Sequence, residues 1–342
     1  MSQLIVREAF ALSALNTFAL PAQAAQYCAL SDSSQLPEVL AAQQRSGLAL
    51  FVLGGGSNLL LTQNLDAFVL HMTTQGKRVL SQQADVVLVE AEAGEAWHPF
   101  VLWTLSQGFG GLENLSLIPG TVGAAPVQNI GAYGVEINDR LHSLDAWDCQ
   151  QEQLVTLNAQ DCAFAYRDSC FKREPARWII LRVRFALYPA ASTPLALEYG
   201  PIRQHLSHLD IAQPTPADVS RAVCAIRAEK LPDPRQLANA GSFFKNPLVP
   251  AQQALALLAQ YPAMPSYPQA DGQTKLAAGW LIEQAGWKGY RDGDAGVHAN
   301  QALVLVNYGS ATGAQMKALA QRIQTDIHER FAVALDIEPI VI

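Results

Sequence analysis

The stretch Pro119–Gly134, with the sequence PGTVGAAPVQNIGAYG, decides the fold of this chain more than any other part of it. It holds four glycines, three alanines and two prolines and no charged residue. Such a run cannot form a stable helix, because glycine loses backbone entropy on folding and proline removes a hydrogen-bond donor. A tight loop that uses small residues only for packing is one interpretation. The other is a loop whose backbone N–H groups lie against a flat ligand, and Gln128, Asn129 and Tyr133 favour the ligand.

A second glycine run follows the apolar strand that we expect over 48–53, and it consists of Gly54, Gly55, Gly56, Ser57 and Asn58. Consecutive glycines let backbone amides point at an anion, and the serine and asparagine add side-chain donors. Leu59 stands where a Rossmann dinucleotide fingerprint needs glycine. The chain also contains no Walker motif. This run is therefore a candidate phosphate cradle of another kind.

The composition limits the classes of function. The chain has 342 residues, of which 50% are hydrophobic and 15% charged, so it can build sizeable cores in two or three domains. A net charge of −7 argues against nucleic acid or an anionic membrane as the main partner. Five cysteines without a C-x-x-C pair suit reduced thiols in the cytoplasm and predict no metal site. No run approaches 18 uninterrupted apolar residues, so we expect no transmembrane helix.

The N-terminal segment imitates a signal peptide, because an apolar stretch over 9–20 precedes small residues at 22–25. Glu8 adjoins this stretch, however, and Ser13, Asn16 and Thr17 interrupt it. We therefore expect residues 1–25 to be part of the mature fold.

Hydrophobic periodicity predicts an α+β chain. The expected helices cover 35–46, 97–105, 217–229, 251–259, 275–284 and 313–331. The expected strands cover 48–53, 68–70, 86–89, 141–147, 178–187, 302–306 and 333–342. The proline-rich segment 188–194 is the clearest domain boundary.

Three polar residues stand in surroundings that suit chemistry. Arg167 lies between Tyr166 and Asp168, where a structural ion pair is the simpler interpretation. Ser242 lies between glycine and two phenylalanines, with no G-x-S-x-G elbow or nearby histidine, so we expect a proton donor or hydrogen-bonding group and not a hydrolase nucleophile. Glu338 interrupts an apolar terminal strand and belongs either to an exposed edge or to a site.

Taken together, these segments resemble the family of UDP-N-acetylenolpyruvoylglucosamine reductases (UDP-N-acetylmuramate dehydrogenases), flavoenzymes of bacterial peptidoglycan synthesis. The resemblance covers nearly the whole chain. It runs over 16–18, 54–61, 119–134, 166–172, 241–247 and 275–282 and ends at Glu338.

The resemblance implies a two-subdomain FAD-binding fold of the vanillyl-alcohol-oxidase type with a separate C-terminal α/β substrate domain. The FAD-binding region would span 1–190, with subdomains of about 1–72 and 73–190. A substrate domain would span 200–330, and a terminal strand, 331–342, would carry Glu338.

The resemblance also implies non-covalent FAD, with NADPH as the electron donor. The loop 54–58 would bind the pyrophosphate, and the loop 119–134 would bind the ribityl and isoalloxazine parts. The implied cofactor-binding residues are Gly54, Gly55, Gly56, Ser57, Asn58, Pro119, Gly120, Thr121, Gly123, Ala124, Gln128, Asn129, Gly131, Ala132 and Tyr133.

The implied reaction passes hydride from flavin N5 to C3 of the enolpyruvyl group of UDP-N-acetylglucosamine enolpyruvate, and a proton to C2. Arg167 would stabilise the developing enolate, and Ser242 would donate the proton. Glu338 would orient or polarise the carboxylate region, and a protonated form would avoid repulsion between two carboxylates.

The implied substrate-binding residues fall into two sets. Lys230, Asn246 and Tyr199 would hold the diphosphate. The pocket wall would contain Tyr133, Arg227, Tyr267, Lys275 and Gln301. The segment 195–203, which contains Tyr199, resembles the tyrosine-bearing loop that closes over substrate in one subclass. The implied enzyme is cytoplasmic and monomeric.

Two alternatives remain open from the sequence. A flavin oxidase of the same fold would pass electrons to oxygen, although such enzymes often tether FAD through histidine or cysteine and neither glycine run contains one. A non-catalytic nucleotide-sugar binder would bind substrate without consuming NADPH.

Overall fold

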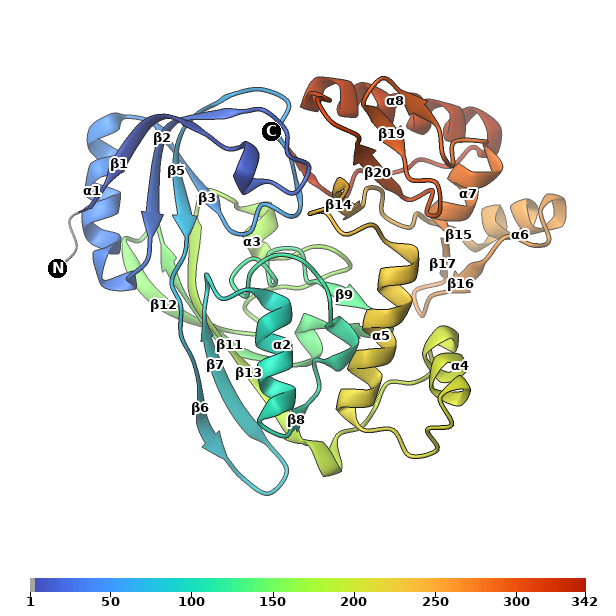
Figure 1. Cartoon of the computed structure of the whole chain (residues 1–342), viewed down its shortest axis with the longest axis horizontal. Coiled ribbons are helices and arrows are strands. Elements are labelled where there is room, and N and C mark those ends of the chain that lie inside the picture. Colours follow the sequence, from blue (N-terminus) through green and yellow to red (C-terminus); the bar gives the residue numbers. More distant parts are fainter. Residues whose placement is uncertain (1–3) are drawn as a thin grey trace. The chain divides into compact units, whose positions relative to one another are not determined.

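The computed structural model describes residues 4–342, which form two compact units that do not follow the order of the chain (Figure 1). Unit 1 contains the chain up to Phe10, Ala24–Gly56 and Asp66–Glu229. Unit 2 contains Ala11–Gln23, Ser57–Leu65 and Lys230–Ile342.

Two sheets and a hairpin build unit 1. The first sheet has the order β1-β2-β5-β3, and the second has the order β12-β11-β13-β7-β6, with β8 paired to β13. The strands are β1 (Val6–Ala11), β2 (Gln23–Leu30), β3 (Ala49–Leu53), β5 (Leu65–Met72), β6 (Lys77–Gln82), β7 (Val87–Glu92), β8 (Phe109–Gly110), β11 (Leu141–Asp148), β12 (Gln153–Asn158) and β13 (Trp178–Pro189), with the hairpin β9 (Gly131–Ala132) and β10 (Val135–Glu136).

The helices of unit 1 are α1 (Leu36–Ser46), α2 (Trp97–Ser106), α3 (Cys170–Arg173), α4 (Gly200–His208) and α5 (Pro216–Lys230). Helices α1 and α2 pack against the sheets of unit 1, whereas α4 and α5 pack against each other in a separate small cluster. Strand β13 contributes to two cores because a β-bulge between Ile180 and Arg182 shifts the alternation of its side chains between the two faces. Its Val183 and Phe185 pack with Phe100 of α2, whereas Ile179 and Leu181 pack with the first sheet and α1.

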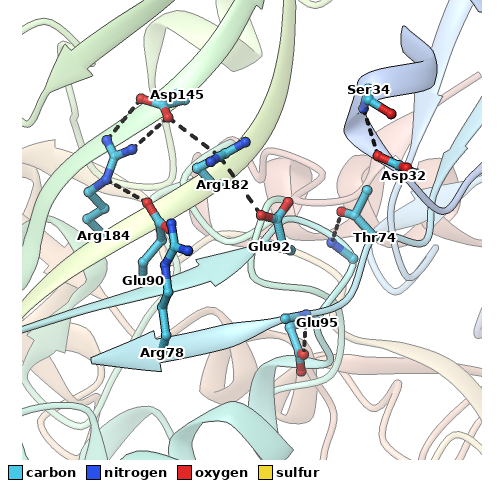
Figure 2. Close-up of polar contacts among 12 residues, drawn as sticks. Asp32, Ser34, Thr74, Arg78, Glu90, Glu92, Glu95, Asp145, Arg182 and Arg184 are labelled. Atoms are coloured by element: carbon cyan, nitrogen blue, oxygen red, sulfur yellow. Dashed lines mark hydrogen bonds and ion pairs between the residues drawn. The ribbon is translucent and has the colours of Figure 1, made fainter. Parts of the chain in front are cut away.

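The face of the second sheet opposite Val183 and Phe185 carries charged side chains in register (Figure 2). Glu90 on β7 faces Arg184 on β13 across the ladder. The Arg184 guanidinium lies 2.8 Å from Glu90 and 2.6 Å from Asp145 of β11. Arg182 adds a contact of 3.5 Å to Asp145. These ion pairs join three strands side by side, with Glu90 and Asp145 nearly buried.

Unit 2 contains three small sheets, with the orders β14-β20-β19-β18, β15-β17-β16 and β21-β4. The strands are β4 (Leu59–Leu60), β14 (Ala238–Ser242), β15 (Leu248–Pro250), β16 (Ser266–Pro268), β17 (Gln273–Leu276), β18 (Arg291–Asp292), β19 (Ala295–Val297), β20 (Val304–Asn307) and β21 (Ile340–Val341). Its helices are α6 (Ala251–Gln260), α7 (Ala278–Gln284) and α8 (Gly313–Phe331).

The longest helix, α8, begins at a capping box formed by Thr312 and Gln315. It buries Met316, Ile323 and Ile327 in the core of unit 2, as its apolar spacing predicts. Phe18 and Leu20, from the N-terminal segment that imitates a signal peptide, are fully buried in the same core.

Two predicted elements differ from the structure. The helix expected over 275–284 begins only at Ala278, because Lys275 and Leu276 belong to β17 and pair with Tyr267 and Ser266. The strand expected over 333–342 is regular only at Ile340–Val341. Its earlier part alternates between buried and exposed residues as a strand does, but it joins residues 243–245 through isolated backbone contacts and not through a continuous ladder.

None of the helices within residues 4–342 has the length and apolar character needed to cross a membrane.

Candidate active site

The two glycine-rich loops lie against each other in unit 1. A Cβ atom added at Gly54 would lie 2.8 Å from Thr121 Oγ1 and 3.1 Å from Ala124 Cβ. One added at Gly55 would lie 2.9 Å from the Gly120 Cα atom. Glycine is therefore required at both positions by the close approach of the second loop. The structure thus brings together two segments that sequence reasoning had paired only by resemblance.

Backbone bonds from the start of α2 fix the second loop. The Trp97 N–H donates to Gly120 O at 3.0 Å, Val122 N–H donates to Glu95 O at 2.8 Å, and Gly123 N–H donates to Ala93 O at 2.9 Å. Because α2 and β7 build this frame, the loop is rigidly held although it forms turns and not a helix.

Thr121 presents an unused polar atom at the junction of the loops. Its Oγ1 is buried and has no hydrogen-bond partner among the residues that the structure describes. A buried hydroxyl without a partner is costly unless a ligand or water completes it. Together, the close-packed glycines and this hydroxyl fit a phosphate-bearing group such as the pyrophosphate of FAD.

The far end of the second loop forms the hairpin β9–β10. Tyr133 and Gly134 occupy its turn with φ values of 51° and 81°, as a tight two-residue turn requires. The predicted cofactor ligand Asn129 braces this end, because its Nδ2 donates to Glu136 at 2.7 Å and to Ala165 O at 3.1 Å.

Arg167 lies against this hairpin. Its Nη2 donates to Gly131 O at 2.6 Å, and its guanidinium carbon stands 5.3 Å from the centre of the Tyr166 ring. Asp168 pairs with Arg173. The positive φ of Arg167, 55°, is unusual for a residue with a side chain and marks a locally strained turn.

Tyr133, Tyr199 and Arg227 also gather in unit 1. The two tyrosine rings meet edge to face with centroids 5.2 Å apart. Burial raises the pKa of Tyr133, and the nearby Arg227 charge opposes this rise. Burial lowers the pKa of the Arg227 guanidinium.

The sequence did not single out Asn114, which is 1% exposed and joins the Tyr133 hairpin to the segment before Tyr199. Its Nδ2 donates to the carbonyl oxygens of Tyr133 and Ala196, each at 2.9 Å. No motif marks it, and only its position just before the glycine-rich loop could have drawn attention to it.

In unit 2, Ser242 and Glu338 are brought together by the backbone. Ser242 ends β14, and the next residue, Phe243, accepts a hydrogen bond at 2.9 Å from the Glu338 N–H. Both side chains are half-buried. Ser57 and Asn58 belong to the same unit, and the Asn58 carbonyl accepts a bond from Ile340 N–H at 2.9 Å.

Other predicted substrate residues occupy distinct places in unit 2. Asn246 Oδ1 accepts a bond at 3.0 Å from Ala278 N–H at the start of α7. Tyr267 and Lys275 are cross-strand partners in β16 and β17. Gln301 Oε1 accepts from Leu303 N–H at 3.3 Å. Lys230 is the last residue of α5.

The remaining predicted cofactor residues belong to the two loops. Gly56 has a φ of 59° and is the last residue of the first loop that belongs to unit 1. Pro119, Gln128 and Ala132 belong to the second, in which Ala132 lies on β9.

Comparison with known proteins places this geometry in a family. A family model described as the C-terminal domain of UDP-N-acetylenolpyruvoylglucosamine reductase matches residues 233–342, and a model of an FAD binding domain matches residues 24–158. UDP-N-acetylenolpyruvoylglucosamine reductase of Pseudomonas putida is 58% identical, with 97% of this chain and 98% of the relative covered. The enzyme of the same name from Chromobacterium violaceum is 55% identical, with 96% of each chain covered.

Solved structures support the fold. The crystal structure of UDP-N-acetylenolpyruvylglucosamine reductase from Thermus caldophilus matches with a TM-score of 0.66 at 22% identity, covering 100% of this chain and 99% of the other. A solvent-stable cholesterol oxidase matches with a TM-score of 0.51 at 12% identity, covering 98% and 87%. The expected α+β FAD-binding fold with a C-terminal domain is confirmed, and FAD is the cofactor. The chain belongs to the family of UDP-N-acetylenolpyruvoylglucosamine reductases and is an oxidoreductase with an FAD-binding domain.

Proposed function

We propose that the chain catalyses the NADPH-dependent reduction of UDP-N-acetylglucosamine enolpyruvate to UDP-N-acetylmuramate in peptidoglycan synthesis, acting on a CH–CH bond. The observation that carries this proposal is the pairing of Ser242 with Glu338, which lie on adjoining backbone segments of unit 2. Adjoining segments of this kind support a site in which a hydroxyl donates a proton and a carboxyl group returns it.

FAD would be held by the two glycine-rich loops of unit 1, with the Thr121 hydroxyl and the backbone around Gly54 and Gly55 at its pyrophosphate. When bound, FAD would supply the hydride-transfer chemistry that links NADPH to C3 of the enolpyruvyl group.

Ser242 would donate the proton to C2. A hydroxyl is a weak acid, so this step requires Ser242 Oγ within about 3 Å of C2 and a neighbour that returns its proton. Glu338, whose N–H bonds the carbonyl of the residue after Ser242, would return this proton and would also orient the substrate carboxylate.

Arg167 would stabilise the negative charge that develops towards the substrate carboxylate. Its guanidinium is already oriented by Gly131 O and by the Tyr166 ring. A preoriented guanidinium needs little reorganisation as charge develops, which makes its stabilisation of the transition state effective.

The remaining predicted residues would bind the sugar nucleotide. Lys230, Asn246 and Tyr199 would hold the diphosphate, with Tyr133, Arg227, Tyr267, Lys275 and Gln301 in the pocket wall. The contact between Tyr199 and Tyr133 supports a closing role for the segment 195–203, because one tyrosine would move against the other. In this scheme residues 1–190 bind FAD, residues 200–330 bind the substrate, and the terminal segment 331–342 carries Glu338. The enzyme would be cytoplasmic and monomeric.

The Ser242→Ala variant tests the proton-donor role. We expect reduction of the bound flavin by NADPH to stay within about two-fold of the unaltered enzyme, and reoxidation by UDP-N-acetylglucosamine enolpyruvate to slow by about 100-fold or more. Stopped-flow absorbance in each half-reaction measures both rates. Ser192→Ala, which removes an exposed hydroxyl, is the matched control. An equal loss in both half-reactions would exclude Ser242 as the proton donor.

A further inference from the structure

A ring of polar contacts joins α5 to the residues just before the glycine-rich loop 119–134. Ser116 and Ser220 are buried, with their hydroxyl oxygens 2.7 Å apart. The Leu117 N–H donates to His98 Nδ1 of α2 at 2.9 Å. His98 Nε2 lies 4.0 Å from Cys224 Sγ, and Cys224 stands one turn after Ser220 on α5. The ring therefore fixes two consecutive residues of the loop's approach to helices α2 and α5 (Figure 1).

The bond from Leu117 determines the protonation of His98. A backbone N–H can only donate, so Nδ1 must be bare and the ring proton must reside on Nε2, facing the Cys224 sulfur. A second proton would occupy Nδ1 and place two donors against each other. The link between His98 and Leu117 can exist only while the imidazole is neutral.

Burial favours the neutral form, and the Arg227 charge adds to it, so that the pKa of His98 is lowered below its usual value. Arg227 and Cys224, both on α5, are the charged and titratable groups facing this ring within residues 4–342. Burial raises the pKa of Cys224, which keeps the thiol neutral. No carboxylate in this surrounding would stabilise a protonated His98.

Leu117 needs such a restraint. Its φ of 59° is in the left-handed region, which is unfavourable for leucine and persists only where neighbouring contacts impose it. Loss of the His98 contact would let Leu117 relax and would displace Pro119 and Gly120, which are two and three residues further on. Gly120 packs directly against Gly55 in the other loop.

Helix α5 also holds the other end of the loop. Ser220, Cys224 and Arg227 have the spacing i, i+4 and i+7 and therefore share one face of the helix. The Arg227 charge acts on the phenol of Tyr133, which closes the loop at its hairpin. One helix face thus restrains the beginning and the end of the loop.

We infer that His98 is a proton-sensitive positioning residue for the flavin loop: its neutral ring fixes Leu117, and its protonation releases the start of the loop and weakens FAD binding. This inference rests on the proposed assignment of residues 119–134 to the flavin. The loop-bound state is complete above the usual histidine pKa of about 6.5 and is lost as pH falls through the lowered pKa of His98.

FAD titration of the full-length apoprotein, followed by flavin fluorescence between about pH 5 and pH 8, tests this inference. For the unaltered chain we expect affinity to fall about five-fold on acidification, which is the effect of one hydrogen bond. His98→Asn keeps an acceptor near the Nδ1 position without titrating, so its affinity should stay nearly constant. His98→Phe removes the acceptor and should bind FAD about five-fold more weakly at every pH.

Two controls separate this effect from general damage. Ser220→Ala removes the hydrogen bond to Ser116 and should weaken FAD binding, but the affinity should still fall on acidification. His142→Asn, on β11, should behave as the unaltered chain does. An acid-induced fall that persists in His98→Asn, or full affinity in His98→Phe, would overturn the inference. Failure of the unaltered chain to bind FAD would overturn the flavin assignment itself, and the two failures are therefore distinguishable.

Discussion

The absence of side chains at Gly54 and Gly55 allows the two glycine-rich loops of unit 1 to approach each other closely. The Gly54→Ala substitution would place a methyl group 2.8 Å from Thr121 Oγ1, closer than real side-chain contacts allow. We expect FAD affinity to fall about ten-fold, the effect of a small overpacking strain. Gly200→Ala is the matched control, since its added methyl would meet no atom within 4 Å. Isothermal titration with FAD measures both, and equal affinities would contradict the assignment.

Arg167 is the second residue whose role a single substitution can test. Lysine keeps the charge but loses the planar fork that binds a carboxylate through two bonds. For Arg167→Lys we expect reoxidation by the enolpyruvyl substrate to slow by about 100-fold, with flavin reduction by NADPH nearly unchanged. Arg173→Lys, at the end of helix α3 and paired with Asp168, provides the comparison. A normal rate of reoxidation in Arg167→Lys would remove this residue from the mechanism.

At the scale of elements, the ion pairs across β7, β11 and β13 stabilise the frame that holds the loops. Burial pushes the pKa of Asp145 upward, but hydrogen bonds from Arg184 and Thr156 outweigh it and leave this pKa below its usual value. A carboxyl group with a lowered pKa stabilises the fold above its unfolded pKa of about 3.9, and that stability is lost as pH falls through the folded value.

The Asp145→Asn variant should therefore lose about 2 kcal/mol of unfolding free energy at neutral pH, because Arg184 and Arg182 lose a largely buried partner. The loss should shrink below about pH 4, because the unfolded chain takes up a proton there and the folded carboxyl does so only at lower pH. Glu174→Gln, which removes a half-exposed partner of Arg177, should change stability by less than about 0.5 kcal/mol. Urea unfolding at several pH values measures these differences. An Asp145→Asn variant as stable as the unaltered chain would show that the network adds nothing.

Local sequence patterns predict some of these elements and not others. Helix α8 follows from its apolar spacing and its cap. Strand β17 and the terminal segment do not, because their limits depend on partners distant in sequence, such as Tyr267 for Lys275 and Phe243 for Glu338. Periodicity indicates which face is buried but not which neighbour supplies the hydrogen bonds.

At the scale of the whole molecule, the sequence predicted the α+β FAD-binding fold through its loops and resemblance. It could not predict that residues 11–23 and 57–65 join unit 2, because such discontinuous units depend on long-range packing. Among site features, the approach of the two glycine loops was implied by resemblance, but the unpartnered Thr121 hydroxyl and the brace at Asn114 were not. Both depend on burial, which a single sequence does not reveal.

The central claim is that bound FAD carries electrons from NADPH to the enolpyruvyl sugar nucleotide. Anaerobic titration of the purified yellow protein with NADPH, followed by addition of UDP-N-acetylglucosamine enolpyruvate, tests it most directly. We predict that NADPH bleaches the flavin absorbance and that the sugar nucleotide restores it, with UDP-N-acetylmuramate formed in equal amount. A reduced flavin that the sugar nucleotide leaves bleached, and that only oxygen reoxidises, would contradict the account.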